Sequence, residues 1–271
     1  MIEQHLPWDD LPAPLRAAIQ QHTGIVTSTE SIEQGLNCSA AVRLSAARGS
    51  FFAKVVREDT EALAGLAQEQ LVAPAVVAVS PVLHLAVHEG GWHALVFDLA
   101  PGRTADLKPG SPDIEAVAAL VQRLAHLPAP PPGLPQFADR YANHLLPGDA
   151  ELLHGEHLLH TDTNPHNLLV DVNANGAAAL LVDWAMPAVG PAWIDAALTA
   201  VRLMEGGQQP AAALAWLDRI PSWRSAPAAA VAAFVGVICR DWAARIGERA
   251  AEPSNARYLA LLGRSLAPAG R

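Results

Sequence analysis

The sequence predicts an α+β fold of two lobes, a β-rich lobe over residues 1–98 and a mostly helical lobe over residues 99–271. Two observations lead to this prediction. About five β-type runs, expected to form an antiparallel sheet, occur in roughly the first hundred residues. Beyond them, alanine-rich segments with helical spacing dominate. The chain has 271 residues, of which 51% are hydrophobic, so it can bury a large core in one domain or in two lobes around a cleft.

The first lobe opens with a helix expected at residues 9–21, where Asp9 or Asp10 lies near the cap and prolines occupy the first turn. A second helix is expected at residues 59–68, from its apolar spacing and its content of helix-forming residues. Residues 88–91 form a turn signal typical of a hairpin. The expected strands of this lobe are 25–29, 41–45, 50–56, 82–87 and 92–99.

The second lobe begins with a helix expected at residues 111–127, because Ser111 is a suitable cap and Pro112 follows it at the first helical position. After a stiff proline-rich connector, residues 136–146 are also expected to be helical. Two short apolar strands around a turn follow, at 168–172 and 179–182. The rest of the chain is expected to be helical with breaks at Gly206-Gly207, Pro221 and Pro253.

The charge balance of the chain is acidic. It carries 18 basic and 27 acidic residues, a formal net charge of −9, and no cluster of lysine and arginine. Proteins that bind nucleic acid usually carry a basic stripe, so a nucleic-acid partner is not expected. An acidic surface mildly favours a cationic small-molecule partner, although many proteins are acidic merely for solubility.

Features of compartment and targeting are few. Cys38 and Cys239 are the only cysteines, and they are too few and too far apart for a disulfide framework. No apolar run reaches the ~18–20 residues that a membrane-spanning helix needs. The N-terminal residues lack a basic segment followed by an apolar one, as a secretory signal would have. We therefore expect a cytoplasmic protein with no membrane partner.

Polar side chains are concentrated in the loop at residues 160–167, which directly precedes a predicted buried strand. Asp162 and Asn167 lie in this loop, and Asp183 ends the second strand of the same short hairpin. The hairpin should therefore return Asp183 to the neighbourhood of Asn167. Carboxylate and amide oxygens are hard ligands that suit Mg²⁺, which keeps waters and nucleotide phosphates in its other positions. Phosphoryl transfer needs such a metal, and also a carboxylate beside the attacking hydroxyl.

At these residues the sequence resembles the aminoglycoside phosphotransferase and choline kinase group, relatives of the protein kinases. The loop of this group has the form H-x-D-x-x-x-x-N, which His160, Asp162 and Asn167 match. The resemblance implies a protein-kinase-like two-lobe fold, ATP or GTP and Mg²⁺ as cofactors, and Asp162 as the catalytic carboxylate. It further implies that Asn167 and Asp183 hold the metal, while His160 and Asp195 support the loop.

The resemblance extends into the first lobe. Lys54 is one of only two lysines, and its strand resembles the one whose lysine holds the nucleotide's phosphates. Glu61 resembles the helix glutamate that pairs with this lysine and is preferred over Glu69, which lies farther along the same expected helix. The remaining nucleotide contacts that the resemblance implies are Gly35 and Ser39 in a phosphate-covering turn, and backbone groups near Asp98 and Leu99 at a hinge.

Three departures from the family pattern involve the site. The glycine-rich loop is thin, Thr161 replaces the usual glycine, and Asp183 is followed by Trp184-Ala185 with no glycine. None removes a reacting group. Taken singly, Asp162 could be a turn former and Asp183 a strand-end cap. A zinc site is also conceivable for the nearby histidines His154, His157, His160 and His166, although Pro165 breaks any helix through them.

The resemblance implies that the acceptor is a hydroxyl of a small polar molecule. An antibiotic such as an aminoglycoside is the leading hypothesis, because a polycation would be attracted to an acidic protein. A metabolite kinase acting on choline-like amines, homoserine or a sugar is the second, and a regulatory pseudokinase that only binds nucleotide is the third. Six carboxylates could line an acidic acceptor site or could equally be surface charges: Asp139, Asp149, Glu151, Glu156, Glu205 and Asp218.

Overall fold

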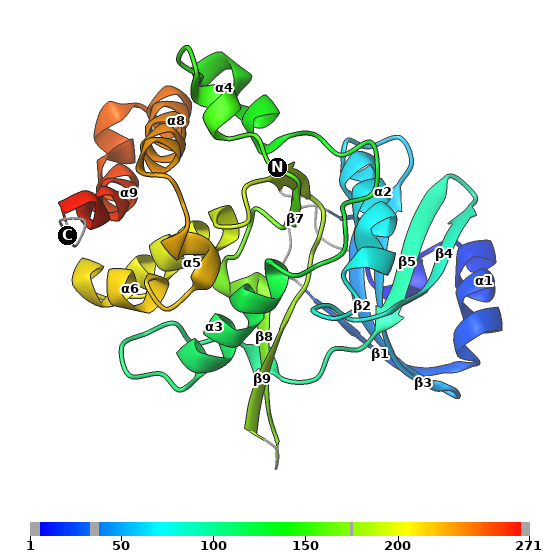
Figure 1. Cartoon of the computed structure of the whole chain (residues 1–271). Coiled ribbons are helices and arrows are strands. Elements are labelled where there is room, and N and C mark those ends of the chain that lie inside the picture. The colour runs from blue at the N-terminus through cyan, green and yellow to red at the C-terminus, as the bar shows by residue number, and fades with distance from the viewer. Residues whose placement is uncertain (1–5, 33–37, 174–175, 267–271) are drawn as a thin grey trace. The chain divides into compact units, whose positions relative to one another are not determined.

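The computed structural model describes residues 6–32, 38–173 and 176–266. The chain divides into two compact units, whose elements can be followed by label in Figure 1. The first unit comprises Met1–Pro101 and Val182–Met186, and the second comprises Gly102–Leu181 and Pro187–Arg271. Compared with the predicted lobes at 1–98 and 99–271, the structure adds a short internal segment that contains Asp183 to the first unit.

A five-stranded antiparallel sheet with the strand order β1-β2-β3-β5-β4 forms the centre of the first unit. Its strands are β1 (Val26–Ser31), β2 (Ala40–Ala46), β3 (Gly49–Arg57), β4 (Leu83–Glu89) and β5 (Trp92–Asp98). All five predicted strands are present. The turn between β4 and β5 needs positive φ at Gly90 (62°) and Gly91 (79°), which explains the paired glycines.

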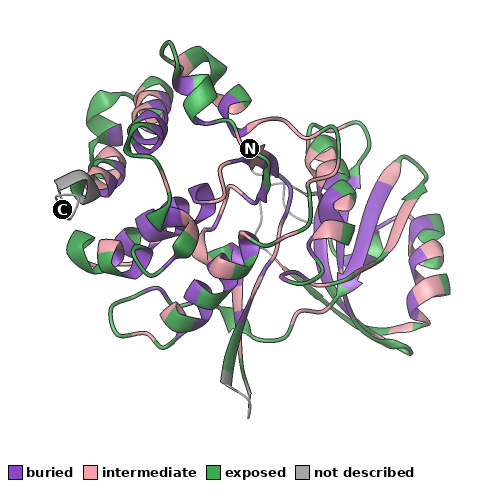
Figure 2. Cartoon of the chain, viewed as in Figure 1, coloured by how far each residue is buried: buried purple, intermediate pink, exposed green. Residues whose placement is uncertain are grey.

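Helices cover both faces of this sheet. α1 (Ala13–Thr23) packs through Leu15 and Ile19 against a cluster that includes Ala53 and Val55 of β3. α2 (Ala62–Val72) packs through Leu66 against the cluster of the opposite face. β5, which lies between β3 and β4, is buried at every position between its two ends (Figure 2).

The alternation of side chains along β3 determines where its lysine points. Successive side chains of a strand point to opposite faces of the sheet. Phe52 and Val56 belong to the cluster that packs against α2, and Lys54 lies between them with the same parity. The lysine therefore shares the face that α2 covers.

The second unit is mostly helical, as predicted. Its helices are α3 (Asp113–Leu124), α4 (Asp149–Leu152), α5 (Ile194–Glu205), α6 (Pro210–Leu217), α7 (Pro221–Arg224), α8 (Ala228–Ile246) and α9 (Glu248–Ala260). Nearly every residue of α5 is buried, because it packs against α3, α6, α7 and α9 (Figure 2). No helix of the described ranges is long and apolar enough to cross a membrane.

Two small sheets accompany these helices. The strands are β6 (Arg103–Thr104), β7 (His157–Leu159), β8 (Leu168–Asn173), β9 (Gly176–Leu181) and β10 (Ala188–Gly190). β8 and β9 form the predicted hairpin, and β6 extends it on the β8 side. β10 pairs with β7, and there Gly155 lies so close to Gly190 that a Cβ on Gly155 would be 2.1 Å from the carbonyl carbon of Gly190. Gly155 thus permits a close approach of the two backbones.

Two helical predictions were wrong in detail. Residues Phe137–His144 form 3₁₀ turns with a kink at Tyr141 in place of an α-helix. Pro253 does not end a helix and lies inside α9. Its ring removes only the hydrogen bond to the carbonyl of Arg249, in the exposed first turn of the helix, where water can replace it. The breaks predicted at Gly206 and Pro221 are confirmed, since α5 ends at the former and α7 begins at the latter.

Candidate active site

The first unit holds a buried ammonium group between two carboxylates. Lys54 Nζ lies 2.8 Å from Glu69 Oε2 and also donates a short hydrogen bond to Asp183 Oδ1. The other oxygen of Glu69 accepts a hydrogen bond from the backbone N–H of Trp184 (3.2 Å). Burial alone would lower the pKa of Lys54, but the two carboxylates outweigh it and raise the pKa above its ordinary value. Lys54 is therefore charged and held in place at neutral pH.

The partner of Lys54 is Glu69, so the preference for Glu61 was wrong. Glu61 is the exposed N-cap residue of α2, whereas Glu69 is 5% exposed and follows Leu66 by three residues on the buried stripe of the helix. Eight residues of helix separate the two glutamates by about 12 Å along the axis, so only one of them can reach the lysine. The apolar spacing of α2 was the signal that could have identified Glu69.

The segment that carries Asp183 is anchored to α2 by close packing. Trp184, the next residue, is 1% exposed. A Cβ on Gly65 of α2 would lie 3.3 Å from Ala185, so this helix position requires a small residue. Asp183 itself adopts φ of 64°, a left-handed conformation that is uncommon outside glycine. Its side chain keeps 30% exposure, so one oxygen contacts Lys54 while the carboxylate stays accessible.

In the second unit, a buried carboxylate fixes the loop that contains Asp162. Asp195, at the start of α5, accepts hydrogen bonds from the backbone N–H groups of His160 and Thr161, both at 2.9 Å. Burial raises the pKa of Asp195, while the nearby His160 and the two N–H groups oppose this effect. The ring of His160 is also buried, and its Nδ1 accepts from the N–H of Asp162 (3.2 Å). These contacts agree with the loop-supporting roles expected for His160 and Asp195.

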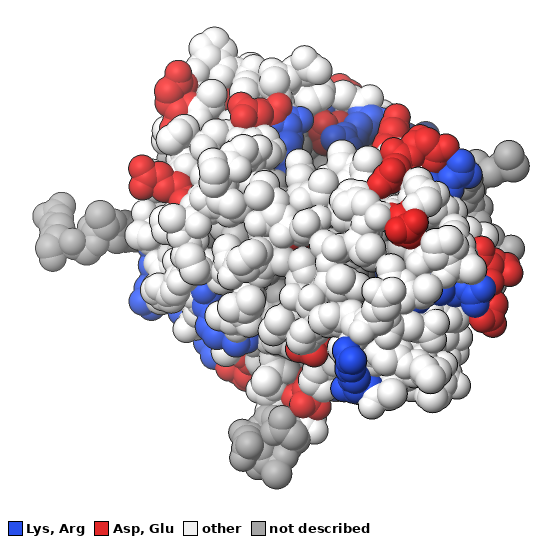
Figure 3. Space-filling model, turned by 90° about the vertical axis from the view of Figure 1, so that its right-hand side faces the viewer, with Lys and Arg blue, Asp and Glu red and all other residues white. Residues whose placement is uncertain are grey.

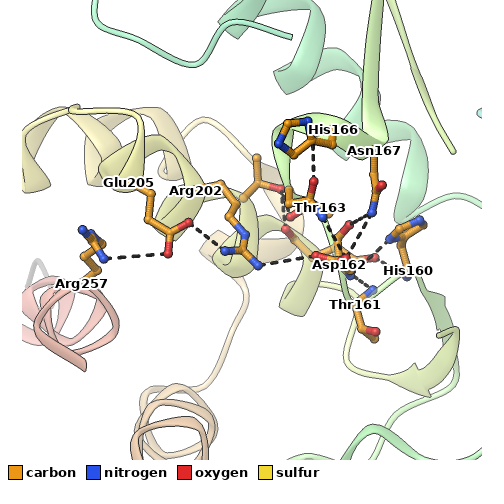
Figure 4. A network of polar contacts seen from close by, with 12 residues as sticks. His160, Thr161, Asp162, Thr163, His166, Asn167, Arg202, Glu205 and Arg257 are labelled. Carbon is orange, nitrogen blue, oxygen red and sulfur yellow. Dashed lines mark hydrogen bonds and ion pairs between the residues drawn. The ribbon is translucent and has the colours of Figure 1, made fainter. Parts of the chain in front are cut away.

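The carboxylate of Asp162 is held on both of its oxygens (Figure 4). Oδ2 accepts from the side-chain amides of Asn164 (2.9 Å) and Asn167 (3.2 Å). Oδ1 lies 3.5 Å from the guanidinium of Arg202 on α5. The side chain is nevertheless 39% exposed, so a carboxylate of fixed orientation remains accessible to a ligand. Asn164 and Arg202 were not identified from the sequence.

Thr161 has an unusual backbone conformation for its residue type. Its φ is 69°, and a β-branched residue rarely adopts the left-handed region. The Thr161 hydroxyl accepts a hydrogen bond from Arg140 (2.6 Å), whose guanidinium also donates to the carbonyl of Pro187 (2.5 Å). A left-handed conformation suits glycine better than threonine, and in this chain Arg140 and Asp195 hold Thr161 in it.

One stripe of α5 contacts the loop at successive turns. Asp195, Thr199 and Arg202 are spaced by four and three residues, so they lie on one face of the helix. Thr199 donates a hydrogen bond to the hydroxyl of Thr163 (3.0 Å), one helical turn from the residues that contact His160 and Asp162. This spacing could have pointed to Arg202, since Asp195 was already identified.

The two expected metal ligands fall in different units, and their chemistry fits Mg²⁺. The amide nitrogen of Asn167 donates to the carbonyl and the carboxylate of Asp162, so the atom directed away from these acceptors is the amide oxygen. Leu168 pairs with Leu181 across the hairpin, so Asn167 immediately precedes the hairpin and Asp183 follows it closely along the chain. An amide oxygen and an accessible carboxylate are suitable ligands for a cation that retains waters and phosphate oxygens.

Of the other nucleotide contacts implied by the resemblance, Ser39, Asp98 and Leu99 have hydrogen-bond partners within the first unit. Gly35 lies outside the described residues. Ser39 Oγ accepts from the N–H of Arg57 at the end of β3 (3.2 Å). The N–H groups of Asp98 and Leu99 already donate to the carbonyls of Val82 and Ser50, at 2.9 and 3.2 Å. In this structure those two N–H groups already have acceptors, so they are not available to donate hydrogen bonds to an adenine ring.

A zinc site is not seen in the histidine-rich stretch. Over the described ranges, no group of three or more His, Cys, Asp or Glu side chains is placed to hold a metal ion. His160 is buried in the loop, whereas His154, His157 and His166 are exposed.

Comparisons with known proteins agree with this geometry. The family model described as the phosphotransferase enzyme family matches residues 132–228, which include the loop and Asp195. No curated protein sequence matches the chain. Among solved structures, a thermostable mutant of aminoglycoside phosphotransferase APH(4)-Ia, in a ternary complex with ADP and hygromycin B, has a TM-score of 0.60 and 14% identity over 93% of this chain and 99% of its own. Choline kinase LicA from Streptococcus pneumoniae has a TM-score of 0.57 and 11% identity over 92% of this chain and 99% of its own.

These similarities confirm the predicted fold, and the family match supports small-molecule kinase activity. The antiparallel sheet of the first unit and the helices of the second are the parts that the fold requires. The chain therefore has the protein-kinase-like fold of the aminoglycoside phosphotransferases and choline kinases, and its catalytic-loop region matches the phosphotransferase enzyme family.

Proposed function

We propose that this protein transfers the γ-phosphoryl group of ATP, or of GTP, to a hydroxyl group of a small polar molecule, with Mg²⁺ as cofactor. The observation that carries the proposal is the fixed and accessible position of the Asp162 carboxylate. Asn164, Asn167 and Arg202 contact this carboxylate. Asp195 fixes the loop that carries it by accepting hydrogen bonds from two backbone N–H groups. A general base needs such a fixed position beside the attacking group.

The chemistry follows from the residues of each unit. The acceptor oxygen attacks the γ-phosphorus, the bond from this phosphorus to its bridging oxygen breaks, and the nucleoside diphosphate leaves. Asp162 accepts the proton that the hydroxyl loses. Lys54, charged and held by Glu69, binds the phosphates of the nucleotide. Asn167 and Asp183 would hold Mg²⁺, which supplies neutralisation of the phosphate charge when bound.

The nucleotide part of the proposal is supported by relatives. The APH(4)-Ia structure contains ADP, and a structure of LicA contains AMP. We also propose that nucleic acid is not a partner, because the chain has a net charge of −9. On the face drawn in Figure 3, basic side chains are interspersed with acidic ones and much of the surface is uncharged.

The acceptor is constrained by the carboxylates that were expected to line an acidic site. Asp149 is paired with Arg240 (2.7 Å) and is largely buried. Glu205 is paired with Arg202 (2.7 Å). Asp139 accepts from the N–H of Gln136 (2.9 Å) as part of a capping box. Asp149 and Glu205 are thus compensated by arginines and are less available to a polycationic acceptor, whereas Glu151, Glu156 and Asp218 are exposed. Both an aminoglycoside and a metabolite with fewer charges are therefore tested as acceptors.

The test is an acceptor panel with the purified protein, Mg²⁺ and either ATP or GTP, read out as nucleotide consumption and product mass. The panel includes aminoglycosides, choline-like amines, homoserine, sugars and nucleosides. We expect turnover of at least one acceptor, and Asp162→Asn should lower kcat by at least ~10²-fold while nucleotide affinity is retained. Asp10→Asn, the same change at an exposed aspartate of the first unit, is the matched control.

Two results would contradict the proposal. Turnover of Asp162→Asn within a few-fold of wild type would remove Asp162 from the mechanism. Nucleotide binding without transfer to any acceptor would favour the regulatory pseudokinase.

A further inference from the structure

Asp162 is linked to α9 by a row of alternating charges (Figure 4). Arg202 Nη2 lies 3.5 Å from Asp162 Oδ1, and its Nη1 lies 2.7 Å from Glu205 Oε2. Glu205 Oε1 is in turn 3.9 Å from the guanidinium of Arg257 on α9. All four side chains belong to the second unit and are between 27% and 39% exposed. The row is therefore only partly accessible to solvent, and its charges compensate one another.

The two contacts of Arg202 differ in strength. The bond to Glu205 has the length of a good charge-assisted hydrogen bond, whereas 3.5 Å to Asp162 is long for a hydrogen bond but still within ion-pair range. Arg202 is thus anchored by Glu205 and only restrains Asp162. This arrangement orients the Asp162 carboxylate and leaves Oδ1 able to accept a hydrogen bond from a hydroxyl group and then its proton.

The other oxygen of Asp162 is in a different situation. Oδ2 accepts two amide hydrogen bonds, from Asn164 and Asn167, and has less capacity left for a ligand. We propose that Arg202 is a positioning residue that fixes the Asp162 carboxylate so that Oδ1 faces the acceptor hydroxyl, and that Glu205 orients Arg202 for this role. The inference rests on the proposed phosphotransferase function.

A purely structural ion pair would behave differently. Loss of an ion pair that only stabilises the fold lowers the melting temperature and leaves kcat of the folded protein unchanged. Misplacement of a catalytic group by about 1 Å can cost 10²-fold in rate without weakening the binding of nucleotide. The separation of kcat from nucleotide KM and from stability therefore distinguishes the two roles.

The experiment compares Arg202→Met, Arg202→Lys and Glu205→Gln with the control Arg219→Met. Arg219 makes an exposed ion pair with Glu115 elsewhere in the same unit, so its replacement is chemically matched. We expect Arg202→Met to lower kcat about tenfold or more, with nucleotide KM within about twofold of wild type. Arg202→Lys should recover only part of the loss, because lysine keeps the charge but cannot bridge both carboxylates as the two guanidinium nitrogens do. Glu205→Gln should give a smaller loss, and Arg219→Met none.

A second readout does not depend on turnover. The side-chain amide signals of Asn164 and Asn167, observed by NMR of protein labelled with ¹⁵N-asparagine, report the position of the Asp162 carboxylate that both amides contact. They should shift in Arg202→Met and stay unchanged in Arg219→Met. If Arg202→Met does not fold, Arg202→Lys and Glu205→Gln decide the question by the same two readouts.

The outcomes separate the inference from the function it rests on. Unchanged amide signals together with kcat within about twofold of wild type in the folded Arg202 variants would overturn the positioning role. A wild-type protein that transfers phosphate to no acceptor would overturn the proposed function, and the amide signals would then still decide whether Arg202 positions Asp162.

Discussion

Glu69 and Glu61 lie on the same helix and provide a direct test of how the lysine site is built. Replacement of Glu69 by glutamine removes one charge, whereas the same replacement at Glu61 changes an exposed position at the start of the helix. We expect Glu69→Gln to destabilise the protein and to weaken nucleotide binding, and Glu61→Gln to do neither.

The size of the effect follows from the two contacts of Glu69. Its carboxylate holds Lys54 at 2.8 Å and accepts from the N–H of Trp184 at 3.2 Å. A hydrogen bond to a charged group contributes about 1.5–3 kcal/mol, and loss of one partner of a buried ion pair can cost about 3–5 kcal/mol. Lys54 keeps Asp183, and glutamine can keep one contact, so we expect about 2–3 kcal/mol. At about 2–4 °C per kcal/mol, the melting temperature should fall by roughly 4–12 °C.

The pH dependence of this effect can be stated from the pKa shift of Lys54. The pKa is raised in the folded protein, so the resulting stabilisation is fully present below the ordinary value of 10.5 and is lost as the pH rises through the higher folded value. The difference between Glu69→Gln and wild type should therefore be the same at about pH 7 and about pH 9.

The assay is urea unfolding at both pH values, followed by titration of nucleotide with Mg²⁺. Equal destabilisation by Glu61→Gln and Glu69→Gln, or a change below about 0.5 kcal/mol for Glu69→Gln, would refute the assignment of the lysine partner. A strong dependence on pH between these two values would refute the explanation of its energetics.

Two further changes test the first unit. Asp183→Ala should abolish Mg²⁺-dependent nucleotide binding, measured by calorimetry with and without the metal. Unchanged metal dependence would end the proposal that Asp183 binds Mg²⁺. The control is Asp59→Ala, a change at an exposed carboxylate paired with Arg57. Lys54→Ala should raise nucleotide KM roughly ten- to a hundredfold, because it removes a charge-assisted contact to phosphate. The control is Lys108→Ala, a change at the other lysine, which is exposed and whose loss should leave nucleotide KM unchanged.

Much of the fold and part of the site could be predicted from local sequence features. Strand and helix periods place the elements of the first unit, because each element buries one face against a common core. The loop from His160 to Asn167 has fixed spacing, so its residues could be named without knowledge of tertiary structure. Lys54 could be named because its strand alternation and the scarcity of lysine agree.

The remaining residues depend on packing between distant segments. Arg140 reaches Thr161 across 21 positions and Arg202 reaches Asp162 across 40, and no local period records such contacts. Glu69 is an intermediate case. It lies on the apolar stripe of α2 and so could have been predicted to face the sheet, but the glutamate of the family pattern was matched to Glu61 instead. The arginine partners of Asp149 and Glu205 could not be predicted for the same reason, because they lie on other segments or on another turn of the helix.

The left-handed Thr161 shows how these long-range contacts affect the chemistry. A non-glycine residue in this region costs on the order of 1–2 kcal/mol, and the cost must be offset by the surroundings. Asp195 binds the N–H of Thr161 and Arg140 binds its hydroxyl, so both ends of the residue are fixed. Asp162 follows directly, and its own N–H is bound by the ring of His160. The backbone that carries the proposed catalytic carboxylate is thus held at three consecutive residues, and Arg202 contacts its side chain. We therefore expect substitutions in α5 and at Arg140 to lower activity without touching the substrate, because these residues offset the strain at Thr161.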